Sequence, residues 1–355
     1  MQTVEQGFDH WPAGGSPTGE SSWQRIVAKY HVSNHWLSSL QLLTGPVAYV
    51  LTCYVAYLIS RVSIWLALAV MVLAAGFYVR SFIVFHDCAH GSFFRSSRAN
   101  TIVGFITGVL AFTPFQHWRR EHSIHHATAG DLDRRGVGDV WTLTVGEYQQ
   151  ASRWVRLSYR LVRNPFLMLL VGPAYQFLVK HRFSSRHDGR RERRSVLWTN
   201  LTLAGIVTLA SLTVGIKAYL LIQLPVFLIG GAAGIWLFYV QHEFEDTWWE
   251  RNDEWDYVRQ ALDGSSFYKL PLVLQWFTGN IGFHHVHHLS PRIPNYHLPR
   301  CHRENSMLQQ VKPLTLWASL KCARLHLWDE EQCKLVPFRT LRSSTLPPRS
   351  GPGRG

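Results

Sequence analysis

The sequence predicts an all-α integral membrane protein with four transmembrane helices arranged as two hairpins. Four apolar runs are each long enough to cross a bilayer, which takes about 20 residues. Only Arg61 separates the first two runs and only Lys217 separates the last two, so each pair has to turn back on itself. Hydrophobic residues make up 47% of the chain, yet the mean hydropathy is −0.04, as expected when apolar spans alternate with basic aqueous segments.

The first elements follow in order along the chain. Residues 1 to about 22 are rich in Gly, Ser and Pro, which is typical of disorder, and we expect 23–37 to form a short amphipathic helix approaching the membrane. Residues 41–60 and 62–85 are the first two spans. Residues 101–115 are apolar but too short to cross, which predicts a re-entrant or interfacial segment.

The second half of the chain holds the other pair of spans, 195–216 and 218–240. Before them, 165–179 is apolar but short and interrupted by proline. After Val240 no stretch reaches spanning length, and the final SSTLPPRSGPGRG is rich in Pro, Gly and Arg, which predicts a mobile tail. We therefore expect a cytoplasmic N-terminal segment (1–38), a membrane domain (39–310) and a cytoplasmic C-terminal segment (311–355).

The distribution of Lys and Arg predicts the orientation. Eighteen of them lie from Arg80 to Arg194, against one in each hairpin link. The positive-inside rule then places the large loop, both termini and every histidine cluster in the cytoplasm. The alternative is a soluble protein with four buried helices, but apolar runs of this length rarely share one soluble core.

Composition argues against a nucleic-acid-binding protein, a disulfide-bonded protein and a protein with a cleaved signal peptide. The net charge of +13 would suit nucleic acid, but the basic residues lie mainly beside apolar runs, which favours membrane lipid as the partner and no nucleic acid. Five cysteines form no CxxC pair and predict reduced thiols. The N-terminus has no apolar core, so it is not a cleaved signal peptide.

Histidines form three clusters beside the apolar runs. An imidazole offers a metal one lone pair, and residues three or four apart share a helical face. His284, His287 and His288 are thus expected to aim at one point, with His285 turned away. His242 closes the fourth span and is a ninth candidate. The predicted ligands are His86, His90, His122, His125, His126, His242, His284, His287 and His288.

The eight nitrogens of the three clusters are too many for one tetrahedral zinc and suit two metals with open positions. We expect them to meet at one membrane depth, under a cytoplasmic helical cap. His117 suits an interfacial role, and His10, His31, His35, His297 and His302 are predicted to be surface residues. The carboxylates that could orient the ligand rings, or instead pair with arginines, are Asp87, Glu121, Asp131, Asp133, Glu245 and Asp246.

The motifs HDCAH, HSIHH and HHVHH, with this membrane pattern, resemble the three histidine boxes of the membrane fatty acid desaturases. The likeness runs from about Leu40 to about Gln310. Two longer stretches, QHEFEDTWWER (241–251) and GNIGFHHVHHLSPRIPNYHLP (279–299), are similar to bacterial and cyanobacterial acyl-lipid desaturases of the omega-6 (Δ12) type. The alanine of HDCAH replaces a more usual glycine at a position that is not a ligand.

That resemblance implies two Fe²⁺ ions, dioxygen as co-substrate and a cis double bond introduced into a fatty acyl lipid in the bacterial inner membrane. An unactivated methylene has no acidic proton, so its hydrogens must be removed as atoms, for which iron and dioxygen are suited. Gly230, Gly231 and Gly234, with neighbouring aromatic residues, could line the acyl slot or simply pack helices.

The chain carries no dinucleotide, iron–sulfur or haem motif, so electrons must come from an external ferredoxin or cytochrome b5-like protein. Its docking site, or alternatively a lipid contact, is expected at Arg119, Arg120, Arg134, Arg135, Arg190, Arg191, Arg193 and Arg194. The alternatives are a hydroxylase or ketolase on the same scaffold, a metal transporter or sensor, and a zinc hydrolase. Histidines at the span ends and the lack of HExxH disfavour the last two.

Overall fold

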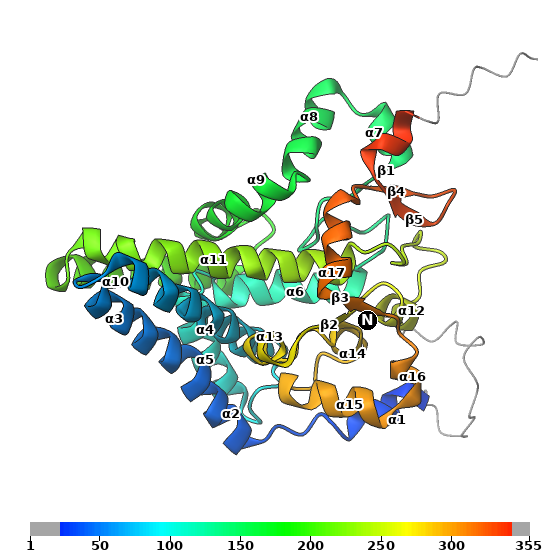
Figure 1. The fold of residues 1–355 in the computed structure, drawn as a ribbon. Coiled ribbons are helices and arrows are strands. Elements are labelled where there is room, and N and C mark those ends of the chain that lie inside the picture. The colour runs from blue at the N-terminus through cyan, green and yellow to red at the C-terminus, as the bar shows by residue number, and fades with distance from the viewer. Residues whose placement is uncertain (1–21, 343–355) are drawn as a thin grey trace, which may run out of the picture.

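The structure, a computed structural model, describes residues 22–342, most of which are helical (Figure 1). The predicted tail from Ser343, the disorder expected for residues 1–21 and the expected surface position of His10 lie outside this range.

Four long helical segments confirm the predicted candidate spans. They are His35–Ser60, α4 (Ile64–His90), α10 (Arg190–Thr213) and α11 (Ile216–His242), and each is long and apolar enough to cross a membrane. The first consists of α2 (His35–Leu42), a π-helical turn η1 (Leu43–Val47) that contains Pro46, and α3 (Ala48–Ser60). In Figure 1 these segments run together toward the left, while most of the short helices and all the strands gather on the right.

The first predicted element needs a correction, because residues 23–37 are not one helix. Helix α1 (Ser22–Ala28) ends early, and α2 begins separately at His35. The Asn34 side chain accepts hydrogen bonds from the N–H groups of Trp36 and Leu37 and so caps α2. An amphipathic pattern spans this break, and the capping residue alone marks the new start.

Helices α4 and α11 extend beyond the predicted spans, and the added turns include histidines. His86 and His90 lie in the last two turns of α4, and His242 is the last residue of α11, whereas we expected them just outside the spans. Gly91 stops α4 directly after His90. Its φ of 71° suits glycine, and the N–H groups of Gly91 and Ser92 bond back to the carbonyls of Cys88 and Asp87.

The segment expected to be re-entrant or interfacial is a bent helix pair. Helix α5 (Ser97–Leu110) and α6 (Phe115–Thr128) meet at an angle of 98°, either as a broken span or as a re-entrant loop. Phe112 at the bend has a positive φ of 53°. Helix α6 carries the second histidine cluster and packs against α4 and α10.

Helix α4 lies at the centre of the membrane bundle, in contact with α3, α5 and α11. One face of α4 buries Ala67, Met71, Ala74 and Tyr78. A Cβ added at Gly230 would lie 2.5 Å from the ring of Tyr78, so this glycine allows α11 to approach α4 closely. For Gly230 the packing alternative therefore holds.

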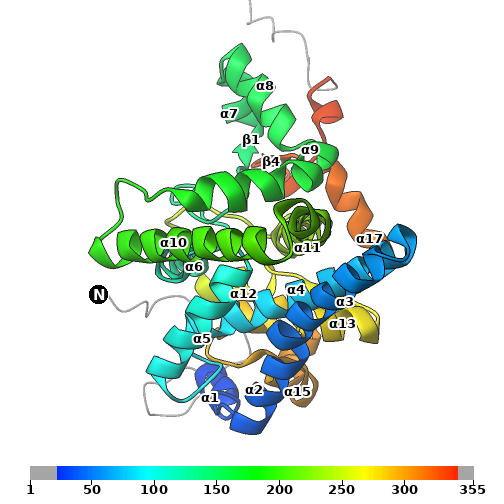
Figure 2. The same ribbon diagram turned by 90° about the vertical axis from the view of Figure 1, so that its left-hand side faces the viewer.

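The other helices of the described chain are short, so no later helix reaches spanning length among residues 243–342. Their bounds are α7 (Val145–Gln150), α8 (Arg153–Val162), α9 (Pro165–Leu170), η2 (Ala174–Val179), η3 (Lys180–Arg182), α12 (Tyr257–Leu262), α13 (Leu272–Phe277), α14 (His284–Leu289), η4 (Asn295–His297), α15 (Leu298–Glu304), α16 (Ser306–Gln309), α17 (Leu316–Ser319), η5 (Leu320–Arg324) and η6 (Phe338–Arg342). Figure 2 shows α7 and α8 standing away from the long helices.

Five short strands correct the expectation of an all-α chain. Strand β1 (Leu143–Thr144) pairs in parallel with β4 (Leu327–Asp329), which pairs antiparallel with β5 (Lys334–Val336). Strand β2 (Phe267–Lys269) pairs in parallel with β3 (Pro313–Thr315). Both sheets pair strands of the C-terminal region with strands earlier in the chain. Strands of two or three residues are too short for an alternating pattern to predict them.

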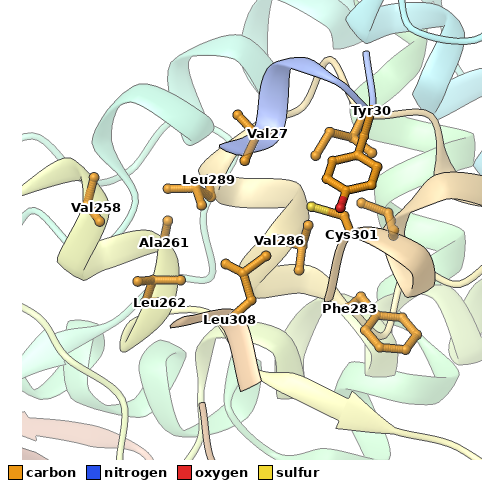
Figure 3. Close-up of a cluster of buried hydrophobic side chains, with 12 residues drawn as sticks. Val27, Tyr30, Val258, Ala261, Leu262, Phe283, Val286, Leu289, Cys301 and Leu308 are labelled. Atoms are coloured by element: carbon orange, nitrogen blue, oxygen red, sulfur yellow. The ribbon is translucent and has the colours of Figure 1, made fainter. Parts of the chain in front are cut away.

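Helix α14 is held by an apolar cluster on the side away from the membrane bundle. Val286 and Leu289 of α14 are buried against side chains from α1, α12 and the α15–α16 region (Figure 3). This apolar face fixes the rotation of a helix only six residues long, and so it determines where the neighbouring histidines point.

Candidate metal centre

The structure brings all nine predicted histidines together, and it divides them into two groups. The first group comprises His86, His90, His122, His126 and His287. The second comprises His125, His242 and His288, with the Nε2 atom of His284 3.0 Å from Nε2 of His242. Within each group, leaving His284 aside, the potential ligand atoms lie within 4.8 Å of one another.

The second histidine cluster (122–126) and the third (284–288) each contribute side chains to both groups. We expected His284, His287 and His288 to point at one metal, and the structure corrects this. His287 belongs to the first group and His288 to the second, and their ring centroids are 5.8 Å apart. In α6, His122 and His126 join the first group whereas His125 joins the second. Helices α6 and α14 therefore lie between two centres and present a different face to each.

The nitrogen contacts fit a cation at each group. Nε2 of His126 lies 3.1 Å from Nε2 of His122 and 3.0 Å from Nε2 of His287, and one N–H can serve only one of these contacts. Two nitrogens bound to one metal at 2.0–2.1 Å are themselves about 3 Å apart. In addition, Nε2 of His90 and Nε2 of His288 are buried with no partner within the described chain. Such bare, convergent lone pairs are what a metal ion requires.

Burial keeps the imidazoles in the neutral form that binds metal. The pKa values of His284, His287 and His288 are held well below the usual range, first by burial and then by repulsion from neighbouring histidines. A neutral ring has a free nitrogen lone pair, whereas a protonated ring has none.

Two carboxylates contact rings of the predicted ligands. Asp139 Oδ1 lies 2.5 Å from Nδ1 of His125, so Nδ1 carries the proton and Nε2, 3.1 Å from Nε2 of His242, is bare. Asp87 Oδ1 lies 3.3 Å from Nδ1 of His86, and its other oxygen accepts hydrogen bonds from Asn295. Both carboxylates are the distal partners that metal-bound histidines usually have.

Comparison with known proteins identifies the family. The family model described as "Fatty acid desaturase" matches residues 63–315, which is more than half of the chain. The chain belongs to the fatty acid desaturase family. It is therefore an oxidoreductase of lipid metabolism, and the resemblance of its histidine boxes to this family is confirmed. Four apolar helices and this membership together indicate an integral membrane protein.

Three relatives illustrate the range of the family. A fatty acid desaturase of Bacillus subtilis is 49% identical over 315 residues, covering 88% of this chain and 90% of the relative. The sn-1 oleoyl-lipid 12-desaturase of Synechocystis is 27% identical, over 62% of this chain and 63% of the relative. A chloroplastic sn-2 acyl-lipid omega-3 desaturase (ferredoxin) of Arabidopsis thaliana is 28% identical, over 83% and 66%.

Histidines outside the two groups match expectation only in part. His285 points away from the other box residues, with its Nε2 3.1 Å from Nδ1 of His302, and burial lowers its pKa to about 3. His302 is itself buried, which corrects its expected surface position. His117 is buried too, 2.9 Å from Asp188. His35 is exposed, and His31 and His297 are half-buried.

Of the six carboxylates proposed to orient ligand rings, only Asp87 contacts one. Glu121 lies near His117 and Lys180, while Asp131, Asp133 and Asp246 pair with Arg134, Arg251 and Lys312, and Glu245 is exposed. The predicted arginine pairing is therefore found for Asp131 and Asp133, whereas Asp246 and Glu121 lie beside lysines.

Sequence reasoning missed Asp139, which lies well past its histidine in a glycine-rich loop. The signal was the pair of glycines before it. Gly138 has a φ of 76°, and a Cβ there would lie 2.9 Å from the backbone oxygen of Glu121 in α6. The glycine lets this loop lie against α6, which brings Asp139 to His125.

A buried ion pair beneath His242 was also missed. Glu243 directly follows the last residue of α11, and its carboxylate accepts hydrogen bonds from Arg163 at 2.8 Å and from Thr142 at 2.7 Å. Arg163 also donates to the carbonyl of Leu325. These buried bonds join α8, α11 and the C-terminal region at the second group of histidines. A cavity of about 10 Å³, the size of one water, lies beside it.

Proposed function

We propose that this desaturase introduces a cis double bond into the acyl chain of a membrane lipid at two iron ions held by the nine histidines. Support comes from one observation above all: eight of the imidazoles form two groups that share the helices α6 and α14, and His284 adjoins the second group. The ligands proposed for one iron are His86, His90, His122, His126 and His287. Those for the other are His125, His242, His284 and His288.

Iron held by imidazoles would supply the reduction of dioxygen and the removal of hydrogen from an unactivated methylene. The overall change takes one hydrogen from each of two neighbouring carbons, and dioxygen leaves as two waters once two external electrons and two protons have been added. Asp139 and Asp87 fix the ring angles of His125 and His86, and the apolar side chains around α4 exclude water.

We propose the Δ12 (omega-6) position for the double bond. The support is the wording of the stretches 241–251 and 279–299 and the name of the Synechocystis relative, which acts on an oleoyl lipid at position 12. The principal alternative is a hydroxylase or ketolase, which would use the same oxidant and return oxygen to carbon.

We also propose the topology of two hairpins with the histidines on the cytoplasmic side. His90 ends α4 and His242 ends α11, so the histidine groups lie at the ends of these helices opposite the short links at 61–63 and 214–215. The excess of Lys and Arg lies on the histidine side. The helices beyond the bundle would then form a cytoplasmic cap over the irons, in the bacterial inner membrane.

Helices α8 and α9 fit the membrane interface. Helix α8 buries Tyr159 toward the protein, and on the same side Arg160 lies over the ring of Phe338. Its opposite face is apolar and exposed, with Trp154 76% accessible, and in α9 Phe166 is 77% accessible. An outward apolar face beside spanning helices is suited to the headgroup and acyl boundary.

For the electron donor we propose an acidic ferredoxin or a cytochrome b5-like protein. The first turns of α10 present Arg190, Arg191, Arg193 and Arg194 to solvent. Such a basic surface would steer an acidic partner, and the Arabidopsis relative carries ferredoxin in its name.

The test is expression in a bacterial host that lacks polyunsaturated lipids, followed by mass spectrometry of the membrane fatty acids. A diene with the new double bond at Δ12 is expected. A hydroxylated or keto chain would instead support the alternative. His125→Ala should abolish the product and lower bound iron while the protein still inserts in the membrane, and His187→Ala, at an exposed site, should change neither.

A further inference from the structure

A second cavity lies away from the two histidine groups and carries positive charge. Its volume is about 380 Å³, within the range of small-molecule sites. It lies between the link from α1 to α2, the loop after α4 and the start of α15, and its lining includes Lys29, Arg95 and Arg300 but no carboxylate.

The cations of this cavity are only partly neutralised. Glu304, which does not line it, lies 3.6 Å from Lys29 and 2.7 Å from Arg300. Arg95 is exposed and has no ion pair with any residue of the described chain. The cavity therefore presents a guanidinium, whose fork of N–H donors matches the oxygens of a phosphate or carboxylate.

Neutral groups in the lining also lack partners. Ser33 is 5% exposed, and its hydroxyl forms no hydrogen bond within residues 22–342. Next to it, His35 begins the helical segment that continues to Ser60, so the positive end of a long helix faces the cavity. The Asn34 side chain already caps two N–H groups of that helix, so a ligand would gain from its dipole rather than from those donors.

Contacts between side chains connect this cavity to the first histidine group. Gln41 lies about 9 Å further along the helix than His35, at 1.5 Å per residue. Its amide donates to Asn295 at 2.7 Å, and the backbone N–H of Asn295 donates to Asp87 at 2.7 Å. Asp87 in turn contacts His86. These buried bonds hold the cavity at a fixed position relative to the proposed irons.

We infer that this cavity binds the phosphate group of the molecule that carries the acyl chain. The inference rests on the proposed function, because it assigns a headgroup site for the same substrate. A phosphate bound between Arg95 and Arg300 would anchor one end of the substrate on the side of the protein where α4 ends. The acyl chain would then enter the bundle toward the histidines. The phosphate is either the diester of a glycerophospholipid or that of a soluble thioester carrier such as coenzyme A.

The experiment measures binding to the full-length protein in detergent by isothermal titration calorimetry. The probes are dihexanoylphosphatidylglycerol, coenzyme A, sodium phosphate and, as an uncharged control, dihexanoylglycerol. The variants are Arg95→Gln, Arg95→Lys and the matched control Arg98→Gln, which removes the same charge from an exposed site three residues away that does not line the cavity.

We expect Arg95→Gln to weaken binding of one carrier, the phospholipid or coenzyme A, by about tenfold or more, because a charge-assisted hydrogen bond is lost. Arg95→Lys should restore part of the affinity, and Arg98→Gln should leave it unchanged. The carrier that responds identifies the source of the phosphate. Equal effects of Arg95→Gln and Arg98→Gln would overturn the inference, as would sodium phosphate binding as tightly as either carrier.

Acyl profiles of cells that express each variant separate the two proposals. Double-bond formation without any Arg95-dependent binding overturns the phosphate site and leaves the proposed function intact. Arg95-dependent binding by a protein that forms no double bond supports the phosphate site and overturns the proposed function.

Discussion

At the scale of single residues, the orientation of one imidazole ring depends on one carboxylate. His125 can present Nε2 to a metal only while its proton is on Nδ1, and Asp139 at 2.5 Å holds it there. The same loop also bonds back on itself, because the N–H of Gly136 donates to Asp139. The carboxylate is therefore fixed before any metal arrives.

Asp139→Asn should lower the affinity of the second group for iron by about 10–100-fold, because the amide no longer stabilises the required tautomer. Iron retained after dialysis against a graded chelator series measures this, and desaturation should fall in parallel. Asp133→Asn is the control, since that carboxylate pairs with Arg251 on the surface. Equal iron retention in the two variants would show that Asp139 does not act on the metal site.

A second prediction concerns pH. The folded protein holds the pKa of His285 at about 3, whereas an unfolded imidazole titrates near 6.5. Below about pH 6.5 the unfolded chain binds a proton that the folded chain refuses, so stability falls with pH by up to about 1.4 kcal/mol per unit. In urea unfolding between about pH 7 and pH 5, His285→Gln should reduce the pH dependence of the unfolding free energy by the contribution of one proton. A wild-type slope in His285→Gln would contradict the assignment.

At the scale of elements, α14 determines the position of the third histidine cluster. The helix is only six residues long and is not stable alone, so its orientation comes from the cluster formed with α1, α12, α15 and α16. Because α14 supplies ligands to both groups, loosening it should disturb both.

Leu289→Ala removes a side chain that is 1% exposed and should cost about 2–5 kcal/mol of stability through the cavity that it leaves. We expect a lower apparent Tm and less iron in both groups. Leu289→Met keeps the volume and should cost less than about 1.5 kcal/mol. Normal iron content in a destabilised Leu289→Ala protein would show that α14 does not need this packing to aim its histidines.

The sequence predicted elements best where one pattern decides the structure. Long apolar runs fixed the existence of the four candidate spans, and histidine spacing identified all nine side chains that converge. It failed where position depends on distant partners. The separate faces of His287 and His288 follow from the apolar cluster behind α14, and the strands follow from pairings across the chain. Asp139 reaches His125 because a glycine permits one loop to touch α6.

At the scale of the whole molecule, the proposed topology allows only one orientation in the membrane. The links beside Arg61 and Lys217 should face the periplasm, and the exposed Cys333 should face the cytoplasm. In intact cells a membrane-impermeant maleimide should therefore label Arg61→Cys and Lys217→Cys variants. The native Cys333 should react only after permeabilisation. Labelling of Cys333 in intact wild-type cells would reverse the topology.

We propose that two irons lie between α4, α6, α11 and α14, which span residues 64–289. The most direct test is the iron-to-protein ratio of purified, active enzyme, measured by mass spectrometry alongside His90→Ala and His288→Ala variants. We predict two irons per wild-type chain, with each variant losing iron from its own group first. Active enzyme that contains no iron, or a single iron lost equally in both variants, would contradict the account.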